Sequence, residues 1–260
     1  MPPARAVFYA ATAAALPMTT CAIFVAPPPL LFSAIAAIAY VAFVLLGVLD
    51  LKLQIFADAI TRGPPDARGV ALTFDDGPDP VWTRRVLDTL DAAGAKATFF
   101  LIARKAEAHP DVVKEILARG HSVGLHSYAH DRLFSMRSER RVREDLTRGI
   151  DVLTRITGER PTLFRPPIGH TNPPIARVAE SLDLTIVGWT VSARDGTRGA
   201  SVDAVTLRIR RSLRDGAIVL MHDAAERGNH EPAGPSALPR VLDAIDAKGL
   251  TVVPLDDWLT

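Results

Sequence analysis

Cysteine is nearly absent from this chain of 260 residues, in which Cys21 is the single example. One cysteine cannot form an intramolecular disulfide, and it excludes a zinc site built from several cysteines. Long runs of basic residues are also missing, and the formal net charge is only +1. A chain with so little excess positive charge is not expected to bind nucleic acid.

Charge is missing altogether from residues 6–49. Three consecutive prolines at positions 27–29 divide this stretch into two apolar segments, residues 6–26 and 30–49. Each segment is close to the ~20 residues that a helix needs to cross a bilayer. Because three consecutive prolines cannot lie inside a helix, residues 1–50 are predicted to form a hairpin of two transmembrane helices that makes the chain integral to the cell membrane.

Such a hairpin returns both of its ends to one side of the membrane. Arg5, Lys52 and Arg62 flank these ends, which mildly favours the cytoplasmic side and leaves the face of the catalytic part open. One alternative is a signal sequence with Arg5 as its charged start. Another is lipidation at Cys21, although the residues before Cys21 match a lipoprotein cleavage site poorly.

A polar linker over residues 51–68 leads into residues 69–260, where short apolar runs alternate with amphipathic segments. Strands are predicted over 69–74, 95–102, 121–125, 162–164, 185–191, 217–221 and 251–254. Helices are predicted over 80–93, 110–119, 138–157, 174–182, 201–213 and 238–248. This alternation predicts an α/β fold with parallel strands, either an open sheet or a barrel, with the chemistry at the carboxyl ends of the strands.

Ionisable side chains follow five of the six strand ends considered, and these are Asp75 and Asp76, His126 and His130, Arg165, Asp195, and His222 and Asp223. His126 and His130 are four residues apart, so one helical turn would place both imidazoles on one face, as a divalent metal requires. With one carboxylate of the Asp75–Asp76 pair they offer two nitrogens and one oxygen, a set that suits zinc and leaves a position for water. The other carboxylate is then free to accept a proton from that water.

Two further strand ends supply partners for this chemistry. Arg165 can hold the free carboxylate in place, and His222 can donate a proton to a leaving group from the other side of the site.

The motifs that carry these residues resemble those of the polysaccharide deacetylase family, carbohydrate esterase family 4, also called the NodB homology domain. The resemblance covers roughly residues 70–254, and five motifs occur in the family's order. They are TFDDGP at 73–78, HSxxH at 126–130, RPPxG at 165–169, a weaker fourth motif around 189–195, and LxH at 220–222.

The resemblance implies a distorted (β/α) barrel of seven or eight strands that hydrolyses the N-acetyl group of an amino sugar, in an acetylated polymer or a glycolipid. It implies one divalent metal ion, zinc or else cobalt, nickel or manganese, with the ligands Asp76, His126 and His130. It also implies four catalytic residues, which are the base Asp75, its partner Arg165, the acid His222 and its partner Asp195.

The fourth motif departs from the DxxDW pattern of the family, because residues 192–196 read SARDG and lack the first acid and the tryptophan. Ile168 stands where the family often has an aromatic residue. These changes put the usual polymer substrate in doubt more than the chemistry. Two alternatives therefore stay open: a deacylase or deformylase of a lipid-linked amino sugar at the cytoplasmic membrane face, and a catalytically silent carbohydrate-binding protein on the same fold.

Overall fold

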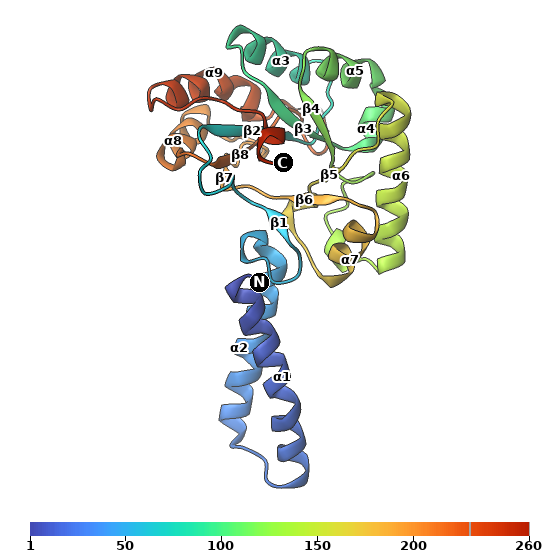
Figure 1. Cartoon of the computed structure of the whole chain (residues 1–260), viewed down its shortest axis with the longest axis vertical. Helices are drawn as coiled ribbons and strands as arrows, with labels where there is room; N and C mark the ends of the chain where they lie inside the picture. The colour runs from blue at the N-terminus through green and yellow to red at the C-terminus, as the bar shows by residue number, and fades with distance from the viewer. Residues whose placement is uncertain (229, 260) are drawn as a thin grey trace.

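The computed structural model describes residues 1–228 and 230–259 (Figure 1). One parallel sheet contains eight strands in the order β1-β6-β5-β4-β3-β2-β8-β7. The strands are β1 (Ala59–Ile60), β2 (Val70–Asp75), β3 (Ala97–Leu101), β4 (Ser122–Leu125), β5 (Leu163–Phe164), β6 (Thr185–Val187), β7 (Val191–Ser192) and β8 (Ala217–His222). The helices are α1 (Pro3–Phe24), α2 (Leu30–Leu49), α3 (Trp82–Ala92), α4 (Ala103–Ala108), α5 (Pro110–Ala118), α6 (Glu139–Thr157), α7 (Pro173–Ser181), α8 (Val202–Ser212) and α9 (Ala233–Asp246).

Helices α3 to α9 surround the curled sheet, so the predicted distorted barrel is confirmed (Figure 1). Successive side chains of a strand point to opposite faces. On β2, Leu72 and Phe74 belong to the core between sheet and helices, whereas Ala71 belongs to a smaller core inside the curl with Phe100 and Ile218. The same alternation turns Asp75 toward the inside of the barrel.

The predicted strand over residues 185–191 is broken into β6 and β7. The carbonyl oxygens of Val187 and Gly188 accept hydrogen bonds from the Arg165 side chain, at 3.2 and 2.9 Å. The predicted last strand is reduced to a single bridge between Val252 and Val70, since the chain then turns into a 3-10 helix, Leu255–Trp258, that packs on the inner core.

Three other boundaries differ from the predictions. Helix α4 was not predicted, α9 begins at Ala233 rather than at residue 238, and the predicted linker contains the edge strand β1, which pairs with β6. Local patterns are weak at these places, because a two-residue strand and a six-residue helix are too short to show a period.

Helices α1 and α2 form the hairpin predicted from the sequence, which projects from the barrel (Figure 1). The start of α1 and the end of α2 lie at the barrel, and the turn between the helices lies farthest from it. By length and composition both are long and apolar enough to cross a membrane, and almost none of their residues is buried inside the protein. The hydroxyl groups of Thr12 and Tyr40 join the two helices at 2.8 Å.

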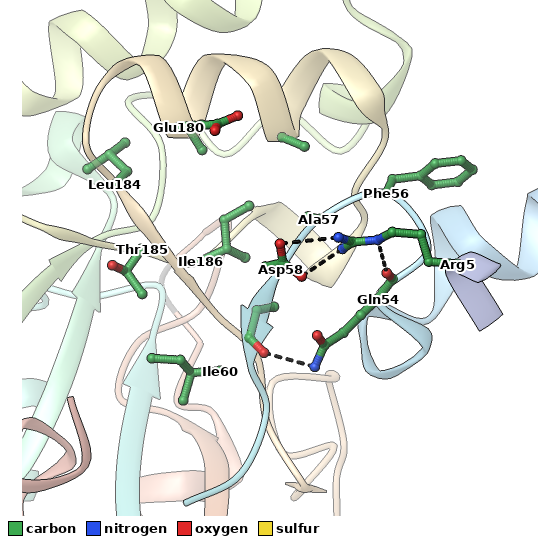
Figure 2. Close-up of a pocket in the computed structure, with 13 residues that line it drawn as sticks. Arg5, Gln54, Phe56, Ala57, Asp58, Ile60, Glu180, Leu184, Thr185 and Ile186 are labelled. Carbon is green, nitrogen blue, oxygen red and sulfur yellow. Dashed lines mark hydrogen bonds and ion pairs between the residues drawn. The ribbon is translucent and has the colours of Figure 1, made fainter. Parts of the chain in front are cut away.

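The barrel end of the hairpin is fastened to the chain that enters the barrel. Figure 2 shows the Arg5 guanidinium reaching across to Asp58 and Gln54 beside a cavity of about 520 Å³. Its Nη2 lies 2.9 Å from a carboxylate oxygen of Asp58, and its Nε donates to the carbonyl oxygens of Gln54 and Ile55 at 2.9 and 3.1 Å. The first turn of α1 is therefore tied to the segment that leads into β1.

Candidate active site

The site is built at the carboxyl ends of two paired strands. Strands β2 and β8 run parallel in a register that places Asp75 beside His222. Asp76 follows at once with a φ of 75°, a left-handed conformation that turns its carboxylate away from the direction of the strand. Two neighbouring carboxylates thus face different partners.

Asp75 is held by Arg165, which is fully buried. The Nη1 group of Arg165 donates to Oδ1 of Asp75 at 2.7 Å and to the hydroxyl of Thr73 at 2.9 Å. The guanidinium also lies 4.1 Å from the centre of the Phe100 ring. Burial lowers the pKa of Arg165, and the Asp75 charge opposes that shift. This bonding leaves Oδ2 of Asp75 available to a reacting group.

Asp76, His126 and His130 meet in a buried cluster in which one ligand atom from each lies within 4.8 Å of the others. Nε2 of His126 and Nε2 of His130 lie 3.6 and 3.4 Å from Oδ1 of Asp76. That oxygen is buried and has no hydrogen-bond partner among the described residues. A buried carboxylate oxygen facing two imidazole nitrogens fits a divalent cation, whose charge would compensate its lost hydration.

The surroundings of His126 favour its neutral form, which is the form that binds a metal ion. Burial lowers its pKa to about 4, although the Asp75 charge opposes the shift. Its Nδ1 lies 2.7 Å from the carbonyl oxygen of Arg165, which fixes the ring and leaves Nε2 for the metal.

The predicted helical turn between His126 and His130 is wrong. The segment has no helix, and Ser127 and His130 have φ values of 61° and 51°. The Ser127 hydroxyl accepts a hydrogen bond from the His130 backbone N–H at 2.9 Å and closes a turn. The two imidazoles converge through this turn rather than through the i, i+4 face of a helix.

His222 is bound to Asp195, a fully buried carboxylate from the loop after β7. Oδ1 of Asp195 lies 2.8 Å from Nδ1 of His222, and Oδ2 accepts from the His222 backbone N–H at 2.8 Å. Burial by itself lowers the pKa of His222, but the charge and hydrogen bond of Asp195, with help from Asp76 and Asp75, raise it to about 10. At neutral pH the imidazole is therefore protonated.

Sequence reasoning missed two residues beside the site. The Glu226 carboxylate lies 3.3 Å from Nδ1 of His130, and the Lys105 ammonium donates to the carbonyl oxygens of Asp76 and Ala225 at 2.7 and 2.5 Å. Asp223, which was grouped with the strand-end residues, is fully buried instead and accepts from the Thr83 hydroxyl, and burial raises its pKa to about 7.

The fold and this cluster define a metal-dependent hydrolase with its site at the carboxyl rim of a distorted barrel. Residues 62–187 match the family model described as polysaccharide deacetylase. A peptidoglycan-N-acetylglucosamine deacetylase of Bacillus cereus is 34% identical over 193 residues, which are 74% of this chain and 69% of that protein. The chain therefore belongs to the polysaccharide deacetylase family, carbohydrate esterase family 4, and it is a hydrolase of carbon–nitrogen bonds other than peptide bonds.

Solved structures agree with this assignment. A crystal structure of a peptidoglycan N-acetylglucosamine deacetylase has a TM-score of 0.71 and 33% identity, covering 76% of this chain and 91% of that one. A pseudoenzyme of the same family from Bacillus anthracis has a TM-score of 0.70 and 26% identity, covering 80% of this chain and 71% of that one. The family thus includes a member described as a pseudoenzyme.

Proposed function

We propose that this protein removes the acetyl group from N-acetylglucosamine units of a glycan or glycoconjugate. The observation that carries the proposal is the unpartnered Oδ1 of Asp76, which faces two histidines beside a carboxylate held by a buried arginine. The named deacetylase relatives support the choice of sugar.

Asp76, His126 and His130 would hold the ion, and their two imidazoles and one carboxylate suit zinc, with cobalt, nickel and manganese as competitors. Such an ion would lower the pKa of a coordinated water and polarise the acetyl carbonyl. Asp75 takes the proton of the attacking water at Oδ2, because its Oδ1 is occupied by Arg165.

His222 completes the reaction as the acid. Its Nδ1 proton is engaged by Asp195, so Nε2 carries the proton that passes to the departing amine nitrogen. The raised pKa of His222 keeps this proton in place at neutral pH. Arg165 and Asp195 act through these two residues as positioning groups.

The hairpin of residues 1–50 anchors residues 69–260, the catalytic domain, in a membrane. Two observations support this proposal: both helices are apolar and uncovered, and their barrel ends are fastened to the domain. Deacetylation then takes place close to the membrane surface.

Substitution of the two aspartates separates their roles. The full chain, purified in detergent and loaded with zinc, is assayed for acetate release from tetra-N-acetylchitotetraose and for metal content. Asp75→Asn should lower kcat by at least about 100-fold, the lower end of what general acid–base catalysis contributes, and keep close to one ion per chain. Asp76→Asn should lose the ion itself.

Retained turnover in Asp75→Asn would contradict the assignment of the base. A wild-type protein that binds zinc and hydrolyses no acetylated amino sugar would instead place the chain with the pseudoenzymes of its family.

A further inference from the structure

The mouth of the catalytic cavity is rich in arginine. The cavity has a volume of about 670 Å³, and its lining includes four arginines, which are Arg132, Arg194, Arg198 and Arg227. Glu226 neutralises part of this charge, because its carboxylate lies 2.6 Å from Nη2 of Arg132 and 3.2 Å from Nε of Arg227. Arg194 and Arg198 form no ion pair with any residue that the structure describes.

Arg194 and Arg198 belong to the loop that departs from the family's fourth motif. The residues on either side of Arg194 are fully buried: the Ala193 N–H donates to the carbonyl oxygen of Leu220 at 2.9 Å, and Asp195 binds His222. Arg194 itself has a φ of 54° and is exposed. A Cβ at Gly196 would lie 3.0 Å from the His222 ring, so this loop passes directly over the acid.

A guanidinium group left without a carboxylate in a binding cavity is suited to an anionic ligand. Arginine donates two parallel hydrogen bonds to phosphate oxygens, whereas the hydroxyl groups of a neutral glycan need no positive charge. We propose that the amino sugar taken by this site carries a phosphate or diphosphate, bound by Arg194 and Arg198. This inference rests on the proposed deacetylation and specifies its substrate.

The hairpin borders the same rim, which bears on the source of the phosphate. The carbonyl oxygen of Val48, at the barrel end of α2, accepts from the Thr171 N–H at 3.1 Å. The Lys52 ammonium donates to the carbonyl oxygen of Thr190 at 3.0 Å. Trp189, which lines the cavity, is next to Thr190. The cavity mouth therefore lies near the barrel end of the hairpin. A phosphate that links the sugar to a lipid is favoured over one that links it to a soluble nucleotide.

The test compares three acetylated substrates with the zinc-loaded full chain in lipid nanodiscs. They are N-acetylglucosamine joined through diphosphate to a lipid, the same sugar joined to uridine diphosphate, and neutral tetra-N-acetylchitotetraose. The two phosphorylated substrates should have the higher kcat/KM. Loss of charge-assisted hydrogen bonds in Arg194→Gln/Arg198→Gln should cut their advantage over the neutral tetramer by about tenfold to a hundredfold, chiefly through KM.

Arg68→Gln is the matched control, because Arg68 pairs with Asp215 at the opposite end of β2 from Asp75. It should leave all three rates unchanged. The phosphorylated substrates should also lose affinity with rising salt in the wild type and less so in the double variant. Inorganic pyrophosphate should inhibit competitively, with a higher Ki in the double variant than in the wild type. This measurement reports binding without turnover.

Equal kcat/KM on neutral and phosphorylated substrates, with a ratio that the double variant leaves unchanged, would overturn the phosphate site while deacetylation stands. A higher rate on the nucleotide than on the lipid substrate would overturn the lipid source. No acetate from any of the three substrates would instead be a failure of the proposed function.

Discussion

At the scale of single residues, the site divides two adjacent carboxylates between two tasks. Asp75 ends a strand and points into the barrel, where Arg165 binds it, whereas Asp76 has a left-handed backbone and meets two histidines. Arg165 compensates the charge of Asp75, whereas the divalent ion proposed for this site would compensate that of Asp76. Their roles differ because the backbone turns between them.

Asp195 is the main group that raises the pKa of His222, so its replacement should move the pH profile. In the proposed mechanism His222 acts while protonated, and activity is lost as pH rises through its pKa, which Asp195, with help from Asp76 and Asp75, raises to about 10. In Asp195→Asn that pKa should fall toward the ordinary value of about 6.5. The alkaline limb of kcat/KM against pH should then shift down by at least about one pH unit, while metal content stays the same. An unchanged limb, in a variant with an unchanged Tm, would show that Asp195 does not control the acid.

The main residues of the site could be predicted because each follows a strand in a recognisable motif. Parallel strands bring their carboxyl ends to one rim, so the sequence order already places Asp76, His126 and His222 together. Glu226 and Lys105 could not be found in this way. One lies in a loop and the other on a short helix, and only the tertiary fold turns them toward the site.

At the scale of elements, a side chain of helix α4 bridges the loop after β2 and the loop after β8, which carry residues of the site. Its Lys105 binds the backbone carbonyl of Asp76, after β2, and that of Ala225, after β8. Burial lowers the pKa of this lysine, and the Asp76 charge opposes the shift. The ammonium therefore holds the loop that carries Asp76 close to the loop after His222, and so acts as a brace between them.

Removal of this brace should loosen the metal site. In Lys105→Met two partly buried carbonyl oxygens lose their donor, which should lower the free energy of unfolding by roughly 1–3 kcal/mol. Zinc affinity, measured by chelator competition, should fall about tenfold or more, as for other groups that support metal ligands. Lys96→Met is the control, because Lys96 also donates to a backbone carbonyl, that of Arg119, on the far side of the barrel from the cluster. Equal losses of zinc affinity in both variants would argue against a brace.

The order of strands and helices could be predicted from periodicity, but three local features could not. The strand after α7 breaks where its carbonyl oxygens bind Arg165, a partner far away in the sequence. The histidine pair keeps helical spacing without a helix, because Ser127 and His130 take left-handed conformations. Strand β1 forms only because β6 offers an edge. Each exception depends on a contact that spacing along the chain does not encode.

At the scale of the whole molecule, the anchor and the barrel are joined at more than one point. Arg5 ties the start of α1 to the segment before β1 (Figure 2). The carbonyl oxygen of Val48 and the ammonium of Lys52 tie the end of α2 to the rim of the cavity. A flexible tether would leave the barrel free to reach glycan at a distance. These contacts instead fix the cavity mouth beside the barrel end of the hairpin.

The topology of the hairpin decides which glycans can reach that mouth. Arg5, Lys52 and Arg62 flank the barrel side, and the turn between α1 and α2 carries no charge, so the catalytic domain should face the cytoplasm. A reporter fused after residue 260 should then give a cytoplasmic signal, and one inserted between Pro28 and Pro29 should give the opposite signal. Identical signals at both positions would show that α1 and α2 do not span the membrane. An external signal after residue 260 would direct the enzyme to assembled glycan, because lipid-linked precursors on the cytoplasmic leaflet would be out of its reach.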